Sequence, residues 1–429
     1  MAKREWYDGR DPDADWRRKA EERIDEYRKG TFTVVVVDGE DQPVEGVEVH
    51  VEQTDHAFGF GTMVDAALLL GDDDEYDPST QEQFREAFTT YFNRGTINYG
   101  FYPWQWMDPE NDQGETGAKA VEWLVERNYP VHGHTVLWNE IERTLPDIRE
   151  LDDPDEIRAR LREHISDQVG TFAGSIDEWD VINHAVWLND LWEENLGGDR
   201  SDWLDWLSTA RDADPEATLF VNEEALRDDD TARNNDREYR KMLDYLTEND
   251  ADLDGVGFMG HFTPDTLLAP SEVIDWLDAY QKYDVELQIT EFDVAQGWHA
   301  EQVEGEPPAV DEAEWREVQA DYVRDFLIAV VSHSAVTAFI TWGFWAGRMW
   351  RPDGAFFSEH FELTPAGAAY VDLVYNEWWT TINGETDENG HFEGGGFAGT
   401  YEVTVRDQDS ETRREITLDS EATTVRIRR

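Results

Sequence analysis

A carboxylate and a histidine follow two short apolar runs in this sequence. Glu291 comes directly after the run 285–290 (VELQIT), and His184 comes directly after the run 178–183 (EWDVIN). The carboxyl end of a strand is where an α/β barrel presents a catalytic group. We therefore interpret Glu291 as a candidate catalytic group. If it is a nucleophile, its proton donor should lie at a strand end such as the one that carries His184.

Polar and aromatic residues also end several of the other apolar runs. Six of the eight runs that we interpret as strands end in this way, and packing alone does not explain that number. Aromatic faces meet the C–H faces of a sugar ring, and carboxylates and amides bind its hydroxyl groups, so the set is typical of a carbohydrate site. The strand-end residues are His132, His134, Trp138, Asn139, Glu140, Asn183, His184, Asn222, Glu223, Glu224, His261, Glu291, Trp342 and Trp345.

These residues need a scaffold that brings many strand ends together. Eight strand-like runs alternate with segments of helical periodicity. Eight such alternations over about 320 residues predict an α/β fold, a (β/α)8 TIM barrel at residues 56–380. The strands are predicted at 58–61, 95–99, 130–137, 176–183, 218–222, 255–259, 285–290 and 336–342, and helices at 116–127, 158–172, 200–210, 235–249, 270–282 and 311–332.

The two ends of the chain lie outside this alternation. Apolar residues at helical spacing predict a helix within residues 1–30. We predict that residues 31–55 and 381–429 pack together as a small accessory β-sandwich, because two strands alone are only marginally stable. Strands are predicted at 33–37, 44–51, 400–405, 413–418 and 423–427, the first two antiparallel to each other.

The charge of the chain is extreme. Its 429 residues include 36 basic and 97 acidic residues, a net charge of −61, and the acidic residues are dispersed along the chain. We interpret them as a solvated acidic surface, which repels itself in dilute buffer and is screened in molar salt. The composition resembles that of proteins from salt-accumulating halophiles. It argues against nucleic acid and anionic membranes as partners.

Other features of the sequence limit the kinds of site and the cellular location that we expect. The sequence has no cysteine, which excludes disulfides and thiolate metal sites. The first residues lack the apolar core of a signal peptide, and no run is long enough to span a membrane. We expect a cytoplasmic protein, or a secreted one if a leader has been removed. Nothing in the sequence predicts the oligomeric state.

The order of the motifs resembles glycoside hydrolase family 10, the retaining endo-β-1,4-xylanases. The resemblance runs from about residue 58 to residue 379 and rests on HGHTVLW (132–138), WDVIN (179–183), GVG followed by His261 (255–261), ITEFD (289–293) and TWG (341–343). It implies that Glu291 is the nucleophile, that Asn183 binds the sugar 2-hydroxyl, and that His134 and His261 orient the nucleophile. It also implies that Trp138, Trp342, Trp350 and the surviving Trp104 line the sugar subsites.

Three positions depart from the family pattern. The Asn-Glu dipeptide that carries the acid/base carboxylate is Asn183-His184 here, the glutamine two residues before His261 is Met259, and most of the polar element after the second strand is replaced in 99–104. Three interpretations of His184 stay open. It replaces the acid/base, or another carboxylate donates the proton, or no group donates and the site only binds sugar. The candidate carboxylates are Glu140, Glu223 and Asp190.

Two functions follow from these alternatives. The first is hydrolysis of β-1,4-linked xylan or related oligosaccharides through Glu291, with retention of configuration. The second is a catalytically impaired carbohydrate-binding protein on a degenerate barrel. The three histidines His134, His184 and His261 with Glu291 match no local metal-ligand motif, so we expect neither a metal nor another cofactor.

Overall fold

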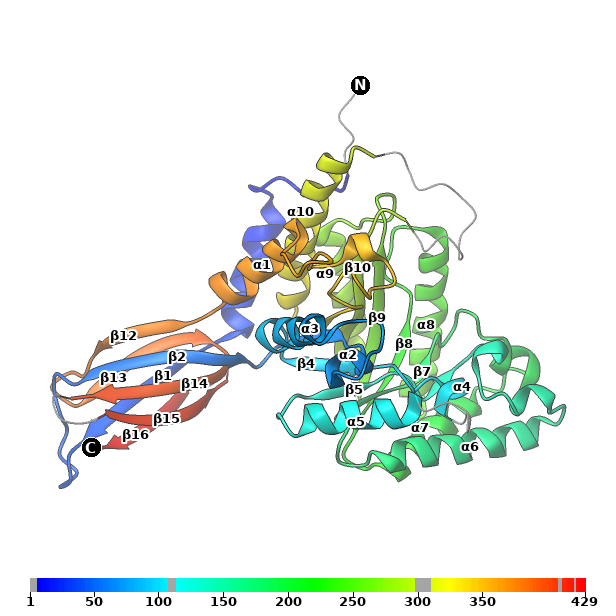
Figure 1. Ribbon diagram of the computed structural model, residues 1–429, viewed down its shortest axis with the longest axis horizontal. Helices are drawn as coiled ribbons and strands as arrows, with labels where there is room; N and C mark the ends of the chain where they lie inside the picture. Colours follow the sequence, from blue (N-terminus) through cyan, green and yellow to red (C-terminus); the bar gives the residue numbers. More distant parts are fainter. Residues whose placement is uncertain (1–5, 107–112, 298–309, 408–410, 420–421) are drawn as a thin grey trace.

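The centre of the structure is a closed parallel barrel. The computed structural model describes residues 6–106, 113–297, 310–407, 411–419 and 422–429. The strands follow the order β5-β4-β3-β11-β10-β9-β8-β7-β6, and β5 also pairs with β7, which closes the sheet (Figure 1). The predicted (β/α)8 barrel is confirmed. Its strands are β3 (Gly59–Met63), β4 (Arg94–Ile97), β5 (Val131–Gly133), β6 (Leu137–Trp138), β7 (Glu178–Asn183), β8 (Thr218–Glu223), β9 (Gly255–Phe262), β10 (Glu286–Val294) and β11 (Val336–Thr341).

Most barrel strands differ from their predicted bounds by one to four residues, and two of these differences bear on the site. The strand predicted at 130–137 is divided into β5 and β6, and both parts pair with β7. Strand β10 continues past the predicted end at residue 290, because Phe292 and Val294 are also buried. Glu291 therefore lies within β10, where the register against β9 shifts between Ile289 and Glu291. Such an irregularity re-aims a side chain without ending the strand.

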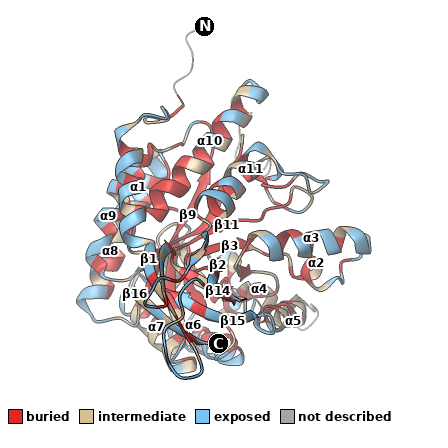
Figure 2. Cartoon of the chain, turned by 90° about the vertical axis from the view of Figure 1, so that its left-hand side faces the viewer, coloured by how far each residue is buried: buried red, intermediate tan, exposed pale blue. Residues whose placement is uncertain are grey.

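Helices surround the barrel and expose their outer faces (Figure 2). All six predicted helices are present with bounds that move by a few residues. Among the described residues, five helices begin at an aspartate whose carboxylate accepts a backbone N–H group, a strong helix start. The barrel helices are α2 (Ala66–Leu70), α3 (Pro78–Tyr91), α4 (Pro103–Trp106), α5 (Gln113–Val125), α6 (Pro154–Thr171), α7 (Ser201–Ala213), α8 (Asp230–Glu248), α9 (Pro270–Tyr280), α10 (Glu312–Val331) and α11 (Pro365–Asp372).

Short helical turns complete the barrel unit. They are η1 (Ile141–Arg143), η2 (Ile148–Glu150), η3 (Leu191–Asn195), η4 (Gln281–Tyr283), η5 (Pro352–Gly354) and η6 (Leu373–Glu377). None of the helices in the described part of the chain combines the length and the apolarity that a membrane crossing needs.

The chain ends together form two further sheets, which lie at the left of Figure 1. One has the order β13-β1-β16 and the other β12-β2-β14-β15. Their inner faces share one apolar core, so the predicted accessory sandwich is confirmed. The strands are β1 (Lys29–Val37), β2 (Glu48–His56), β12 (Thr381–Glu385), β13 (His391–Phe397), β14 (Gly399–Arg406), β15 (Glu411–Leu418) and β16 (Ala422–Arg428).

The predicted pairing of 33–37 with 44–51 is wrong. Strand β1 pairs with β13 and β16, and β2 pairs with β12 and β14, so the two strands belong to opposite sheets. Val34 and Val36 of β1 meet Val49 and Val51 of β2 in the shared core. Alternation places apolar residues on one face of a strand, and here those faces stack instead of lying side by side.

Helix α1 (Asp15–Tyr27) connects this sandwich to the barrel. Trp16, Ala20 and Ile24 are buried at the predicted helical spacing, and α1 packs against α10. At the end of α1, the Arg28 guanidinium donates to the carbonyl oxygens of Val331, His333 and Val336, at 2.8, 2.5 and 2.7 Å. These bonds fix the start of β1 to the strand that follows α10.

Candidate active site

A cavity of about 740 Å³ opens at the carboxyl ends of the barrel strands. Its size is typical of a small-molecule site, and aromatic and titratable side chains dominate its wall. Glu291 lies on this wall and is 5% exposed. The lining residues are Met63, Asn98, Tyr102, His134, Trp138, Arg143, His184, Trp187, Leu188, Glu224, Arg227, Thr231, Met259, His261, Glu291, Trp342, Arg348 and Trp350.

Both carboxylate oxygens of Glu291 have partners. The Asn222 amide donates to Oε1 at 3.0 Å, and His261 Nε2 lies 3.1 Å from Oε2. Asn222 is itself fixed, because it donates to Asn183 Oδ1 at 3.1 Å and accepts from the Thr290 hydroxyl at 2.7 Å. Glu291 is thus held by neighbouring strands in one orientation, as a reacting group requires.

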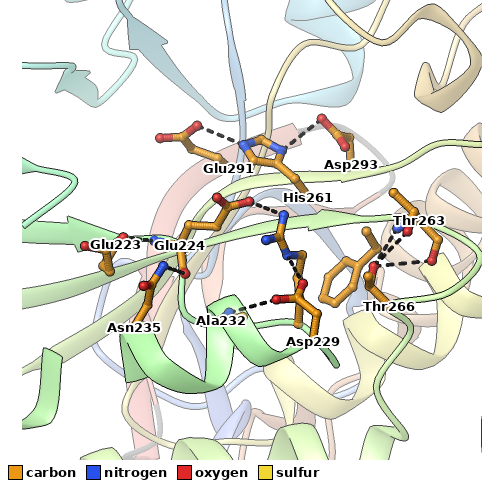
Figure 3. Close-up of polar contacts among 12 residues, drawn as sticks. Glu223, Glu224, Asp229, Ala232, Asn235, His261, Thr263, Thr266, Glu291 and Asp293 are labelled. Carbon is orange, nitrogen blue, oxygen red and sulfur yellow. Dashed lines mark hydrogen bonds and ion pairs between the residues drawn. The ribbon is translucent and has the colours of Figure 1, made fainter. Parts of the chain in front are cut away.

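His261 connects Glu291 to Asp293 (Figure 3). Its Nδ1 lies 3.0 Å from Asp293 Oδ2. Burial disfavours the charged imidazole, but the attraction of Asp293 and Glu291 outweighs burial and raises the pKa of His261 to about 9. Asp293 also pairs with Arg351 and accepts from Trp350 Nε1 at 2.9 Å. A cationic imidazole therefore faces the Glu291 carboxylate at neutral pH.

A second row of charges runs through the barrel interior toward Glu291. His134 Nδ1 lies 2.6 Å from Asp180, and its Nε2 lies 3.9 Å from Glu291. His132 lies 3.1 Å from both Asp180 and Glu178. Burial alone would lower the pKa of His132, but Asp180 and Glu178 raise it to about 9. The side chains beneath the site are therefore fixed by alternating imidazoles and carboxylates.

His184 lies on the cavity wall at the end of β7. Its ring packs between two indoles, with centroids 4.9 Å from Trp138 and 5.4 Å from Trp187. Its backbone adopts a φ of +50°, a conformation that is uncommon for residues other than glycine. The Nδ1 atom is buried without a hydrogen bond, 3.8 Å from Glu223 Oε1.

The other predicted proton donors lie away from the cavity. Glu223 is fully buried, and three backbone N–H groups donate to its carboxylate, so it reaches neither sugar nor solvent. Glu140 pairs with Arg143 at 2.9 Å, and Asp190 accepts the backbone N–H of Ile141 at 2.8 Å. Of the four predicted donors, only His184 lines the cavity with Glu291. The predicted sugar contact of Glu223 does not fit its burial.

The predicted aromatic residues divide into two groups. Trp138, Trp342 and Trp350 line the cavity. Trp104 is not among the lining residues; its ring stacks on Tyr102 with centroids 4.6 Å apart and an angle of 8° between the planes. Trp345 packs away from the site against Phe361 and Tyr76 and donates to the carbonyl of Glu359. It belongs to the core, and its predicted sugar contact does not fit this position.

Sequence reasoning placed Glu224 at a strand end without giving it a role, and it did not select Arg227. Both line the cavity and pair with each other, and Arg227 also lies 2.9 Å from Asp229. Burial raises the pKa of Glu224 against the opposing charge of Arg227. In Figure 3 the Glu224 carboxylate lies on the side of Glu291 and His261. Glu224 directly follows Asn222 and Glu223, and this position next to a strand end could have identified it as a site residue.

Tyr102 was also missed. It lines the cavity, accepts from the Asn98 amide at 3.0 Å and packs against Trp138 with centroids 5.7 Å apart. Burial and the charge of Glu291 raise the pKa of the phenol well above its ordinary value. Tyr102 therefore stays neutral and offers a sugar an aromatic face close to the carboxylate.

Comparison with known proteins agrees with this geometry. The family model described as Glycosyl hydrolase family 10 matches residues 54–373. The chain is 29% identical over 397 residues to the Anti-sigma-I factor RsgI6 of Acetivibrio thermocellus, covering 91% of this chain and 46% of that protein. It is 23% identical over 367 residues to Endo-1,4-beta-xylanase 2 of Arabidopsis thaliana, covering 85% of this chain and 31% of that protein. The chain thus spans less than half the length of these relatives.

Solved structures share the fold. Xylanase 10B from Thermotoga petrophila RKU-1, in complex with xylobiose, superposes with a TM-score of 0.63 at 23% identity, covering 75% of this chain and 95% of that one. Native xylanase 10B from Thermotoga maritima gives a TM-score of 0.63 at 22% identity, covering 75% and 96%.

Proposed function

The chain belongs to glycosyl hydrolase family 10, and from that premise we propose that it hydrolyses β-1,4-linked xylan or related oligosaccharides with retention of configuration. The observation that carries the proposal is the position of Glu291. It lies on the wall of an aromatic-lined cavity at the strand ends, and both of its oxygens are held by Asn222 and His261. This is how a nucleophilic carboxylate is kept aligned for attack.

In the first step a Glu291 oxygen attacks the anomeric carbon of the sugar. The glycosidic C–O bond breaks, and a proton donor must protonate the leaving oxygen. Water then attacks the same carbon, the ester to Glu291 breaks, and the deprotonated donor accepts the proton of that water. Asn183 contributes to the alignment by accepting from Asn222, which in turn donates to Glu291. The indoles of Trp138, Trp342 and Trp350 are the sugar-stacking surfaces.

We assign proton donation to His184. Its imidazole lines the same cavity as Glu291 and follows Asn183 directly. An imidazolium can protonate a leaving oxygen, because the ordinary pKa of histidine lies near neutral pH. Nε2 is the ring nitrogen that can face the leaving group, since Nδ1 is buried on the side of Glu223.

Two substrates with different leaving groups test both roles. An activated aryl β-xyloside needs little help from an acid, so its cleavage reports on Glu291, whereas xylo-oligosaccharides need the donor as well. We expect wild type to cleave both in molar KCl, with the β-anomer as the first product by NMR. Glu291→Gln should lose on the order of 10⁴-fold or more in kcat on both while sugar binding persists. Unchanged turnover in that variant would disprove the nucleophile.

His184 is tested with the same substrates. His184→Ala should lose xylo-oligosaccharide cleavage by about 10²-fold or more and retain most aryl xyloside cleavage. His184→Glu supplies a carboxyl group at the same backbone position and serves as the control for loss of the donor. Equal losses on the two substrates in His184→Ala would refute the assignment.

A second function is sugar binding without turnover. It is favoured by one observation, the histidine at the position where the family pattern has a carboxylate. It predicts that wild type binds xylo-oligosaccharides calorimetrically, cleaves neither substrate, and gains hydrolysis in His184→Glu.

A further inference from the structure

We propose that Glu223 is a positioning residue that fixes the orientation of the His184 imidazole, so that Nδ1 faces a buried carboxylate and Nε2 faces the leaving group. The inference rests on the proposed function and specifies how its proton donor is held. Glu223 then acts through His184 and touches no substrate, because its side chain is fully buried.

The first argument is the backbone that Glu223 holds. Its Oε2 accepts the N–H groups of Val186 and Trp187 at 2.7 and 3.0 Å, and its Oε1 accepts the N–H of Glu224 at 2.8 Å. The segment that follows β7 has two left-handed residues, His184 with φ +50° and Leu188 with φ +52°. Such conformations persist only when surrounding contacts enforce them. Glu223 provides these contacts directly between the two strained residues.

The second argument is the unpartnered ring nitrogen. His184 is 8% exposed, and its Nδ1 is buried without a hydrogen bond. Glu223 Oε1 lies 3.8 Å away, slightly beyond hydrogen-bond distance. Hydrogen bonds of catalytic groups are often long before substrate binds and shorten in the complex. A small rotation of the ring between Trp138 and Trp187 closes this gap.

The remaining charges around His184 do not take this role. Glu224 acts on His184 electrostatically, but it is paired with Arg227 and lines the cavity. Glu291, His134 and His261 also line the cavity, the side that we assign to Nε2. Arg143 lies beyond the opposite indole, with its guanidinium 4.9 Å from the Trp138 ring centre. Glu223 is therefore the carboxylate on the Nδ1 side.

The chemistry follows from this orientation. When Nε2 gives its proton to the leaving oxygen, the ring becomes neutral and keeps its remaining proton on Nδ1, which donates a hydrogen bond to the Glu223 carboxylate. In the second step Nε2 takes a proton from the attacking water and the imidazolium forms again. A carboxylate that holds one ring nitrogen in this way fixes the tautomer and stabilises the imidazolium, as in triads of other folds.

Glu223→Gln separates this role from a merely structural one. The glutamine oxygen can still accept from Val186 and Trp187, but its NH₂ group replaces Oε1, so it loses the bond from the Glu224 N–H and meets His184 Nδ1. The loss of that backbone bond alone would affect both substrates equally. We expect kcat/KM for xylotriose to fall about tenfold to a hundredfold more than for an activated aryl β-xyloside, and the alkaline limb of the pH–rate profile to move to lower pH. The control is Asp190→Asn, which removes the charge of another carboxylate that accepts a nearby backbone N–H. It should change neither the ratio of the two kcat/KM values nor the position of the alkaline limb.

Equal losses of Glu223→Gln on both substrates with an unmoved pH profile would overturn the proposal and leave the proposed function intact. A wild type that cleaves neither substrate would instead refute the proposed function. A measurement that needs no turnover still tests the orientation of the His184 ring in that case. The ¹⁵N shifts of His184, assigned by their loss in His184→Asn, should show the neutral ring protonated at Nδ1 in wild type and at Nε2 in Glu223→Gln. A wild-type ring protonated at Nε2 contradicts the proposal, even if the variant fails to fold.

Discussion

The charged state of His261 makes the stability of the fold depend on pH. Its pKa is raised from 6.5 to about 9, which corresponds to roughly 3 kcal/mol of extra stabilisation of the imidazolium in the folded state. The side chain is 6% exposed, so solvent screens this interaction little. The contribution is fully present below about pH 6.5, where His261 is protonated in the folded and unfolded states alike, and it is lost as the pH rises through about 9.

The perturbation is His261→Gln, which removes the titrating group and keeps a polar side chain between Asp293 and Glu291. Urea unfolding in constant molar KCl should give a stability difference between wild type and variant that is flat below about pH 6.5. The difference should then fall by roughly 3 kcal/mol by about pH 9 to 10. Other groups that titrate in this range, such as His132, cancel in the difference.

His164 provides the matched control. It is also a buried histidine, but it contacts the Val136 carbonyl, and burial lowers its pKa to about 4. The difference between wild type and His164→Gln should therefore be flat from pH 6.5 to 9.5 and change only at lower pH. If the His261→Gln difference also stays constant within about 1 kcal/mol over that range, the charged state of His261 is refuted.

Two further predictions concern the surface and the sugar site. With a net charge of −61, the protein should melt at a lower temperature in dilute buffer than in molar KCl, because salt screens the self-repulsion; equal melting temperatures would contradict the halophilic interpretation. Trp138→Ala should raise the Kd for xylo-oligosaccharides by about tenfold or more through loss of an aromatic stacking surface, measured by calorimetry in the Glu291→Gln background. Trp345→Phe, a core position away from the cavity, is the control and should leave the Kd unchanged.

Local patterns in the sequence predicted the barrel well. Each strand run carries its own signal, and the alternation with helices leaves few topologies. Strand ends also meet at one edge of a parallel barrel, so Glu291, His134, His184 and His261 were expected together before any contact was known. The structure places all four on one cavity wall.

The errors concern contacts that strand position alone does not determine. Strand β1 takes its partners from the far end of the chain, and alternation does not reveal whether two apolar faces lie side by side or stack. Glu223 and Glu224 are adjacent, yet three backbone N–H groups donate to the carboxylate of Glu223, whereas Glu224, directly after the end of β8, lines the cavity. Trp345 was placed at the site from a strand end that continues into a packed loop.

The sandwich has a consequence for synthesis on the ribosome. Strand β1 pairs with β13 and β16, which are made roughly 350 to 400 residues later. At about 5–20 residues per second, the valine-rich β1 emerges roughly 20 to 80 seconds before its last neighbour exists. An unpaired apolar strand is a template for association with other chains. The barrel can assemble during that interval, so we expect the nascent chain to need a chaperone at β1 until β16 has been made.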